Sequence, residues 1–576
     1  MLTAGLIAVA SCSDFSDYND VPVDELATGN QTLWENISQN PQLSDFAALL
    51  KRTGFDVELS NTRSYTVWAP LNNTFDAGAF ASLSDSALLQ QFVKNHVAEY
   101  SHVASGRVNE RIHTLNKKSY TFEGNGTYSF ADKTISKPNV PSNNGVMHLL
   151  DGQVRFYPNL YEYLSMGDNI ELLSAQFMRY ELSTLDTKNS VKGPVVGGMQ
   201  TYIDSVIVTT NTLTRSLNAS LANEDSSYTF LMPTDKAFMA MYNKVKPLFN
   251  FISKTTVQDV ENFGKANDSQ TKSVTVDAAY LSDSLTRRVI TADLIYSNND
   301  AYNQWLVGNG PETDTLRSTT RGKFSNPHDI LDQTVERVEL SNGYAHIVDS
   351  LAFLPWETYN FKRDINPLYY AYSSNSKDRF SYSTRTVRVP DSVSQKMFDP
   401  QVTNFRYMWM YPTSDYAKPE VYIELPGVLS TTYKFYCVFL PDTFKMSDDS
   451  YVVLGSDGRP NILNFQLSYC NAKGNLATYS FSSKFLNSGV AKDENPSKVD
   501  KTTAFINDTT KVDTVYLGQF TFPVAYNGLG DYSPNIHISN PIGVFNANDM
   551  RTYTRDIRIA AIIMKPVEME EYEEKQ

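Results

Sequence analysis

The sequence predicts an α+β protein in which two tandem mixed α/β modules precede an antiparallel β-sandwich-like domain. Three observations support this prediction. The chain of 576 residues is too long for a single hydrophobic core. A pair of motifs occurs twice before residue 358, and helical periodicity disappears after it. The chain contains 35 Tyr and 31 Phe, and aromatic residues favour strands. The rest of its composition is that of an ordinary globular protein.

An opening motif marks the start of each repeated copy. Residues 65–75 read YTVWAPLNNTF, and residues 228–238 read YTFLMPTDKAF. In each copy an apolar strand ends at a proline, which stops the ladder of backbone hydrogen bonds. The polar residue that follows, Asn72 or Asp235, is predicted to cap a short helix.

A closing motif follows in each copy. Residues 144–151 read NGVMHLLD, and residues 342–349 read NGYAHIVD. Asn-Gly predicts a tight turn that leads into a strand. The proline and the final Asp are 81 residues apart in the first copy and 116 apart in the second, so the second copy contains an insertion of about 35 residues.

Helical spacing connects the two motifs of the first copy. Apolar residues recur from position 88 to position 97, and Ser84 is a suitable N-cap. His96, His148 and His346 each lie among apolar neighbours. A structural role is favoured for all three, because no partner nucleophile or acid is identifiable.

Together these segments resemble the fasciclin domain, with Asn95, His96 and Val97 as the middle motif. Residues 29–158 contain all three segments, whereas residues 159–357 lack the histidine at the corresponding stretch 288–294. The resemblance implies two compact mixed α/β modules of a kind known for adhesion and extracellular interactions. It implies no general catalytic residues and no cofactor.

Residues 1–12 indicate export. A short apolar stretch ends in Val-Ala-Ser-Cys, which resembles the bacterial lipobox, with Cys12 as the lipidated residue. The acidic start of the expected flexible tether, residues 13–28, resembles a surface-export signal of bacteria that carry SusC/SusD-type uptake systems. We therefore expect an outer-membrane protein that faces the extracellular side and contacts the membrane only through acyl chains such as palmitate.

Residues 358–576 are predicted to be β-rich. Strand patterns occur at 421–425, 433–440, 462–470, 515–524 and 557–564, between turn residues. Strand alternation places Phe405, Tyr407, Trp409 and Tyr411 on one face. The favoured interpretation is half of a sandwich core; the alternative is an exposed platform for sugar rings or an extended peptide, extended by the tyrosines at 369, 370 and 372.

Charge and cysteine content limit the partners. A net charge of −14 without a basic stripe argues against nucleic-acid binding. Cys437 and Cys470 are interpreted as buried free thiols, with a disulfide as the alternative, and no Cys/His spacing indicates a metal site. The acidic run at 568–574 is interpreted as a solvated tail.

Two functions remain open from the sequence. The preferred hypothesis is a non-catalytic accessory lipoprotein of a SusC/SusD-like (RagA/RagB-like) importer that binds a glycan or peptide nutrient. The alternative is a fasciclin-type adhesin that binds host matrix or neighbouring cells. Enzyme activity is not expected, because no nucleophile elbow, phosphate-binding loop or zinc-protease motif occurs.

Overall fold

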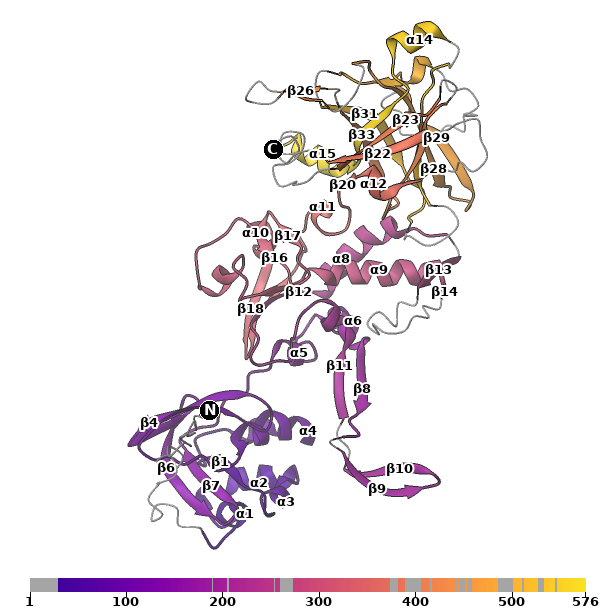
Figure 1. Ribbon diagram of the computed structural model, residues 1–576. Coiled ribbons are helices and arrows are strands. Elements are labelled where there is room, and N and C mark those ends of the chain that lie inside the picture. The colour runs from indigo at the N-terminus through magenta and orange to yellow at the C-terminus, as the bar shows by residue number, and fades with distance from the viewer. Residues whose placement is uncertain are drawn as a thin grey trace, which may run out of the picture. The chain divides into compact units, whose positions relative to one another are not determined.

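A computed structural model gives the fold (Figure 1). It describes residues 29–188, 190–204, 207–252, 254–258, 273–372, 382–388, 406–414, 417–440, 443–445, 451–453, 458–484, 501–509, 512–526, 533–543 and 546–576. The predicted lipidation site Cys12, the tether at 13–28 and Phe405 lie outside these residues. Within them, no helix has the length and apolar character needed to cross a membrane.

The chain divides into two compact units. The first consists of Met1–Tyr163, Leu221–Ser227 and Glu339–Gly343. The second consists of Leu164–Ser220, Tyr228–Val338 and Tyr344–Gln576. Mixed α/β content with several sheets agrees with the predicted α+β class.

A seven-stranded sheet in the first unit joins the two motifs of the first copy. Its strand order is β2-β1-β7-β6-β5-β4-β3. Strand β1 pairs in parallel with β7, which places Tyr65 opposite Gly145, so the opening and closing motifs lie side by side. The strands are β1 (Tyr65–Pro70), β2 (Val97–Glu99), β3 (Arg107–His113), β4 (Ser119–Asn125), β5 (Thr127–Phe130), β6 (Lys133–Ser142) and β7 (Gly145–Leu150).

Both faces of β1 are buried, which explains its uninterrupted apolar sequence. One face, including Val67, packs with the helices α1 (Leu33–Ser38) and α2 (Ser44–Arg52). On the other face, Trp68 stacks on Phe130 of the strand meander, with ring centroids 3.9 Å apart. A third short helix, α3 (Phe55–Glu58), precedes β1.

The predicted helix before β2 is irregular. Ser84 is the N-cap of α4 (Asp85–Leu88), as predicted. The chain then continues as the π-helical segment η3 (Leu89–Val93) and the 3₁₀ segment η4 (Lys94–His96). Such changes of winding alter which side chains share a face, so the apolar spacing alone does not give the local structure.

The second copy repeats the central strand order of the first. Its sheet runs β15-β12-β19-β18, and the corresponding strands of the first copy run β2-β1-β7-β6. The strands are β12 (Tyr228–Pro233), β15 (Ile295–Ser297), β18 (Thr334–Leu340) and β19 (Gly343–Val348). The helices are α5 (Leu160–Tyr163), α6 (Glu171–Met178), α7 (Thr212–Ser216), α8 (Asp235–Val245), α9 (Ala278–Ala292) and α10 (Pro327–Leu331).

The helix-cap prediction at Asn72 and Asp235 is wrong in an informative way. Thr234, one residue earlier, is the N-cap of α8. Asp235 instead accepts a hydrogen bond from the backbone N–H of Leu172 in α6, at 2.8 Å. Asn72 does the same for Asp45 in α2, at 3.1 Å. Both side chains therefore satisfy a free N–H at the start of an earlier helix.

The insertions of the second copy lie in two places. Between the motifs, β13 (Lys254–Gln258) and β14 (Ser273–Asp277) form a hairpin, and β16 (Leu316–Arg317) pairs with β17 (Lys323–Phe324). Before the opening motif, an unpredicted arm occupies residues 181–211 between α6 and α7. It consists of two antiparallel strand pairs, which Figure 1 shows as arrows. They are β8 (Glu181–Leu185) with β11 (Ile207–Asn211), and β9 (Val191–Val196) with β10 (Met199–Asp204).

Two sheets dominate the described part of residues 358–576, and inner residues such as Phe435 and Phe465 form one core between them. The first sheet contains β20 (Arg363–Ile365), β22 (Tyr382–Arg388), β23 (Arg406–Pro412), β25 (Thr432–Phe439), β31 (Asp513–Thr521) and β33 (Ile557–Pro566). The second sheet contains β21 (Ala371–Tyr372), β24 (Glu420–Glu424), β28 (Ile462–Cys470), β29 (Leu476–Ser480), β30 (Phe505–Ile506) and β32 (Asn535–Ser539).

The acidic tail is not simply solvated. It forms α15 (Val567–Glu573), and Glu570 accepts hydrogen bonds from Lys434 Nζ at 2.8 Å and from the Tyr436 hydroxyl at 2.6 Å. Burial opposes ionisation of Glu570, but these two hydrogen bonds and the charges of Lys434 and Lys565 together outweigh it and lower its pKa. The acidic composition did not reveal partners located on β25.

The two cysteines are free, so the disulfide alternative is wrong. Cys437 is buried in the core between the two sheets, and burial raises the pKa of its thiol. Cys470 is half-buried and follows the core residue Tyr469 on β28, so it faces the other side of the second sheet. The two sulfur atoms therefore lie on opposite sides of the second sheet.

Candidate functional site

The asparagine of the closing motif holds the first copy together. Asn144 is buried, and its Oδ1 accepts a hydrogen bond from the N–H of Leu33, the first residue of α1, at 2.8 Å. Its Nδ2 donates to the carbonyls of Leu59 at 2.8 Å and Asn61 at 2.7 Å. At the next position, a Cβ on Gly145 would lie 1.9 Å from the Tyr65 carbonyl oxygen, so only glycine fits.

Asn342 makes the same contacts in the second closing motif. Its Oδ1 accepts from the N–H of Leu160, the first residue of α5, at 2.9 Å. Its Nδ2 donates to the carbonyls of Leu221 at 2.8 Å and Asn223 at 3.1 Å. The asparagine of the closing motif therefore has a structural function in both copies.

His96 is tied into the core of the first copy. Its Nδ1 donates to the Phe92 carbonyl at 2.8 Å, and its Nε2 accepts from the Val154 N–H at 2.9 Å. Burial lowers its pKa to about 4, so the ring is neutral at pH 7. Both ring nitrogens are occupied by backbone groups, which leaves neither for proton transfer to a substrate.

The closing-motif histidines are also neutral, and His148 is buried whereas His346 is half-buried. His148 Nε2 donates to the His102 carbonyl at 2.9 Å, and Nδ1 accepts from the Asn139 N–H at 3.3 Å. His346 lies 3.1 Å from the Thr334 hydroxyl through Nδ1. Burial lowers the pKa of each ring to about 4. This geometry supports the structural role that the sequence favours.

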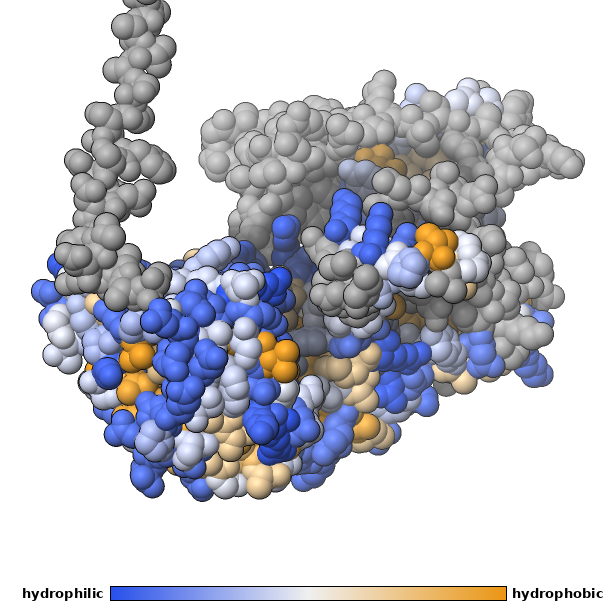
Figure 2. Space-filling view, turned by 90° about the horizontal axis from the view of Figure 1, so that it is seen from below, coloured by the Kyte–Doolittle hydropathy of each residue, from blue (hydrophilic) through white to orange (hydrophobic). Residues whose placement is uncertain are grey.

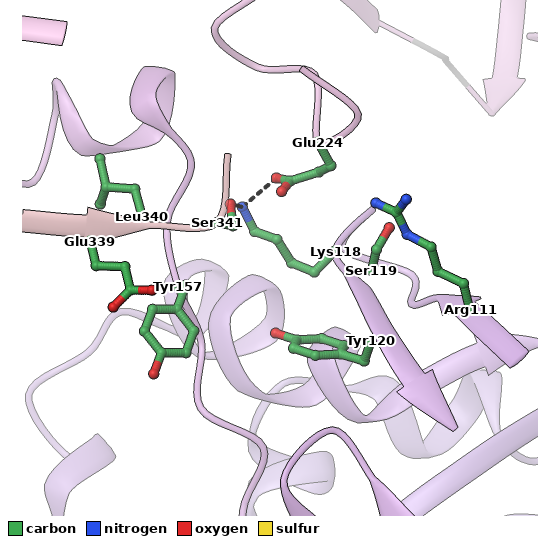
Figure 3. A pocket seen from close by; sticks show the side chains of 9 residues that line it. All are labelled: Arg111, Lys118, Ser119, Tyr120, Tyr157, Glu224, Glu339, Leu340 and Ser341. Carbon is green, nitrogen blue, oxygen red and sulfur yellow. Dashed lines mark hydrogen bonds and ion pairs between the residues drawn. The ribbon is translucent and has the colours of Figure 1, made fainter. Parts of the chain in front are cut away.

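A small pocket in the first unit surrounds a buried lysine (Figure 3). Lys118 Nζ donates to Glu162 Oε2 at 2.6 Å, to Glu224 Oε1 at 2.7 Å and to Ser341 Oγ at 3.2 Å. The ammonium therefore uses all three of its donors, and two carboxylates stabilise its charge. Lys118 consequently has no free donor for an anionic ligand.

Apart from Leu340, the remaining residues of this pocket are polar, and several of them are paired. Tyr120 donates to Asn95 Oδ1 at 2.8 Å, and burial raises the pKa of its phenol. Arg111 pairs with Asp225 at 3.3 Å. We interpret the pocket as a structural polar junction. The pocket has a volume of about 250 Å³. Figure 3 shows the residues that line it, which are Arg111, Lys118, Ser119, Tyr120, Tyr157, Glu224, Glu339, Leu340 and Ser341.

Comparison with known proteins identifies one segment of the chain. Residues 41–154 match the family model of the fasciclin domain. Residues 41–154 form a fasciclin domain. Fasciclin domains are generally non-enzymatic modules of adhesion and binding. No curated protein matches the chain at a significant level.

Among solved structures, a fasciclin-domain pair from the insect cell adhesion molecule fasciclin I is similar to this chain. The identity is 12%, the match covers 56% of this chain and 99% of that chain, and the TM-score is 0.20.

In the part of this chain that the structure describes, no cluster of His, Cys, Asp or Glu is arranged to hold a metal. On the face shown in Figure 2, hydrophobic residues form small separate spots among hydrophilic ones.

Outside the fasciclin domain, the described residues of the predicted aromatic row do not belong to the core between the two sheets. Met408 and Met410 of β23 face the core between the two sheets, so Tyr407, Trp409 and Tyr411 point to the opposite side. Tyr407 has 0% exposure there and is not available to a ligand. Trp409 and Tyr411 are half-buried, and Trp409 Nε1 donates to an aspartate at 2.9 Å.

A different aromatic row crosses the second sheet, again outside the fasciclin domain. Tyr372 stacks on Tyr422 with centroids 5.4 Å apart, and Tyr422 stacks on His537 with centroids 4.3 Å apart. These residues are direct cross-strand neighbours on β21, β24 and β32. The strand pattern at 421–425 places Tyr422 on an outer face, but no sequence signal pairs it with the other two rings.

Proposed function

We propose that this chain is a non-catalytic surface lipoprotein, anchored through Cys12, that acts as an accessory binding subunit of a SusC/SusD-like outer-membrane uptake complex for glycans or peptides. The fasciclin domain at residues 41–154 supports a binding role. The lipobox and the acidic residues after it support anchoring at the surface of a bacterium that contains such complexes.

The arm at residues 181–211 is the observation that favours a protein partner. On the β9/β10 pair, Val195 is 64% exposed and Met199 is 75% exposed, and Leu182 and Val208 are exposed on the β8/β11 pair. A two-stranded ribbon is only marginally stable by itself in water. Burial of these apolar side chains against a partner protein would stabilise both the ribbon and the complex.

The experiment is a pull-down of the tagged full-length protein from detergent-solubilised outer membranes, with mass spectrometry of the captured proteins. We expect a SusC/SusD-like pair in near-stoichiometric amount. In the double variant Val195→Glu and Met199→Glu, recovery of the pair falls about tenfold, because the charges oppose burial of the ribbon. Val335→Glu, at a site that is 60% exposed outside the arm, is the matched control.

Capture of the protein alone would remove the uptake proposal. The fasciclin domain then favours the second candidate, an adhesin that binds host matrix or neighbouring cells. Immobilised matrix proteins provide the direct test, and adhesion that persists in cells without the uptake pair would support the adhesin.

A further inference from the structure

The aromatic row on the second sheet ends at the edge strand β21 of the described sheet. Val421 and Ile423 face the core, so Tyr422 between them faces outward, and Tyr372 and His537 stand on either side of it. The interplanar angles are 21° and 12°, so the three rings are nearly parallel. Each inner ring face is therefore covered by a neighbouring ring.

Only the terminal tyrosine of this row can extend the stack. One face of Tyr372 lies against Tyr422, and the side chain is still 42% exposed. Immediately before it, the short helix α12 (Pro367–Tyr370) presents two more tyrosines. Tyr369 is 75% exposed and Tyr370 is 37% exposed. Three exposed phenol rings therefore come from four consecutive residues.

The polar groups beside these rings favour hydroxyl-rich ligands. Glu424 is exposed and is close enough to Tyr372 to raise the pKa of the phenol, an effect to which burial contributes most. Glu420 is held by His537 Nε2 at 3.0 Å. Carboxylates accept hydrogen bonds from hydroxyl groups and repel acidic ligands. The electron-rich faces of the rings attract the C–H groups of a sugar ring.

We propose that this edge is a binding site for a neutral glycan, in which one pyranose ring stacks on the exposed face of Tyr372 and a second contacts Tyr369. Glu424 accepts hydrogen bonds from the sugar hydroxyls. An extended peptide at the same edge is the competing outcome of the test. We define Tyr369, Tyr370, Tyr372 and Glu424 as the tyrosine edge. This site goes beyond the proposed uptake role and does not depend on it.

The test is isothermal titration calorimetry of the full-length protein with maltoheptaose, cellohexaose, mannohexaose and xylohexaose. We expect saturable binding of at least one of them. Tyr372→Ala should weaken that binding about tenfold, or about 1.4 kcal/mol, and Tyr369→Ala about threefold. Tyr372→Phe should keep most of the affinity, because the stacking ring remains.

Tyr100→Ala is the matched control. Tyr100 is 71% exposed, similar to Tyr369, but it belongs to the fasciclin domain. Its replacement should leave glycan binding unchanged. The proposal is overturned if none of the four oligosaccharides binds, if Tyr372→Ala binds as well as the unmodified protein, or if a proline- and aromatic-rich peptide binds at the tyrosine edge while the sugars do not. Circular dichroism shows whether each variant is folded. If Tyr372→Ala does not fold, the affinity of Tyr372→Phe decides, and the proposal requires that most of it is retained.

Discussion

The two copies of the repeated module have the same frame, by which we mean the order of the central strands and the backbone contacts of the closing-motif asparagine. They differ in the residues buried beside this frame. Both place their opening and closing strands in one order, and both use the closing-motif asparagine to bind three backbone groups. The pairing registers, in which Val67 faces Val97 and Phe230 faces Ile295, align His96 with Leu294. The hydrogen bonds from asparagine to the backbone are therefore present in both copies, whereas the histidine at position 96 has no counterpart in the second copy.

The position before the histidine differs as well. Asn95 of the first copy aligns with Asp293 of the second. Asp293 is buried, and its Oδ1 accepts hydrogen bonds from the hydroxyls of Ser318 at 2.7 Å and Thr320 at 2.5 Å. Burial raises its pKa more than these bonds lower it. The comparison shows that the frame accepts an amide or a carboxyl group at this position.

The largest expected effect is a difference in acid sensitivity between the copies. His96 and His148 have pKa values of about 4 in the folded first copy, against an ordinary 6.5. Their stabilising effect is complete above about pH 6.5 and is lost as the pH falls toward 4, because the unfolded chain binds protons first. The expected loss is roughly 3 kcal/mol for each histidine.

Hydrogen exchange followed by mass spectrometry, corrected for intrinsic rates at each pH, measures this difference in the full chain. Peptides from β1 and β7 should lose protection earlier, as the pH falls, than peptides from β12 and β19. In the second copy Leu294 replaces one histidine, and protonation of Asp293 opposes the effect of His346. Equal loss of protection in both copies would contradict this prediction.

The next effect concerns the shared frame. Asn144→Ala and Asn342→Ala each leave one buried N–H and two carbonyls without their partner, so each should destabilise the folded state by about 3 kcal/mol. Denaturant unfolding of the full chain measures the loss. Asn125→Ala, at an exposed position of β4, should change stability by less than about 0.5 kcal/mol. If the two buried variants were as stable as this control, the frame interpretation would fail.

The smallest effect has the opposite sign. Asp293→Asn places in the second copy the residue type that the first copy contains. The ionised carboxyl destabilises the folded state at neutral pH, and that penalty disappears as the pH falls through its raised pKa. We expect the variant to be more stable at pH 7, by less than about 1 kcal/mol, with a smaller difference at pH 4, close to the ordinary pKa of the carboxyl group. Thermal unfolding at the two pH values provides the measurement, and a less stable variant at pH 7 would refute it.

The sequence by itself determined the features that local patterning controls. The repeated motifs located β1, β7, β12 and β19, and apolar runs between turn residues located the five clearest strands after residue 358. Both kinds of prediction succeed because a strand buried on one or both faces needs a defined set of apolar residues.

Tertiary structure alone decided the contacts between distant segments. Asn72 and Asp235 satisfy helices that precede them, Glu570 binds two side chains of β25, and Tyr372, Tyr422 and His537 stack from three separate strands. The arm at 181–211 also carried no repeat or motif. Sequence periodicity specifies which face of a strand a side chain occupies, whereas the partner on that face is set by sheet order and register, which no local pattern encodes.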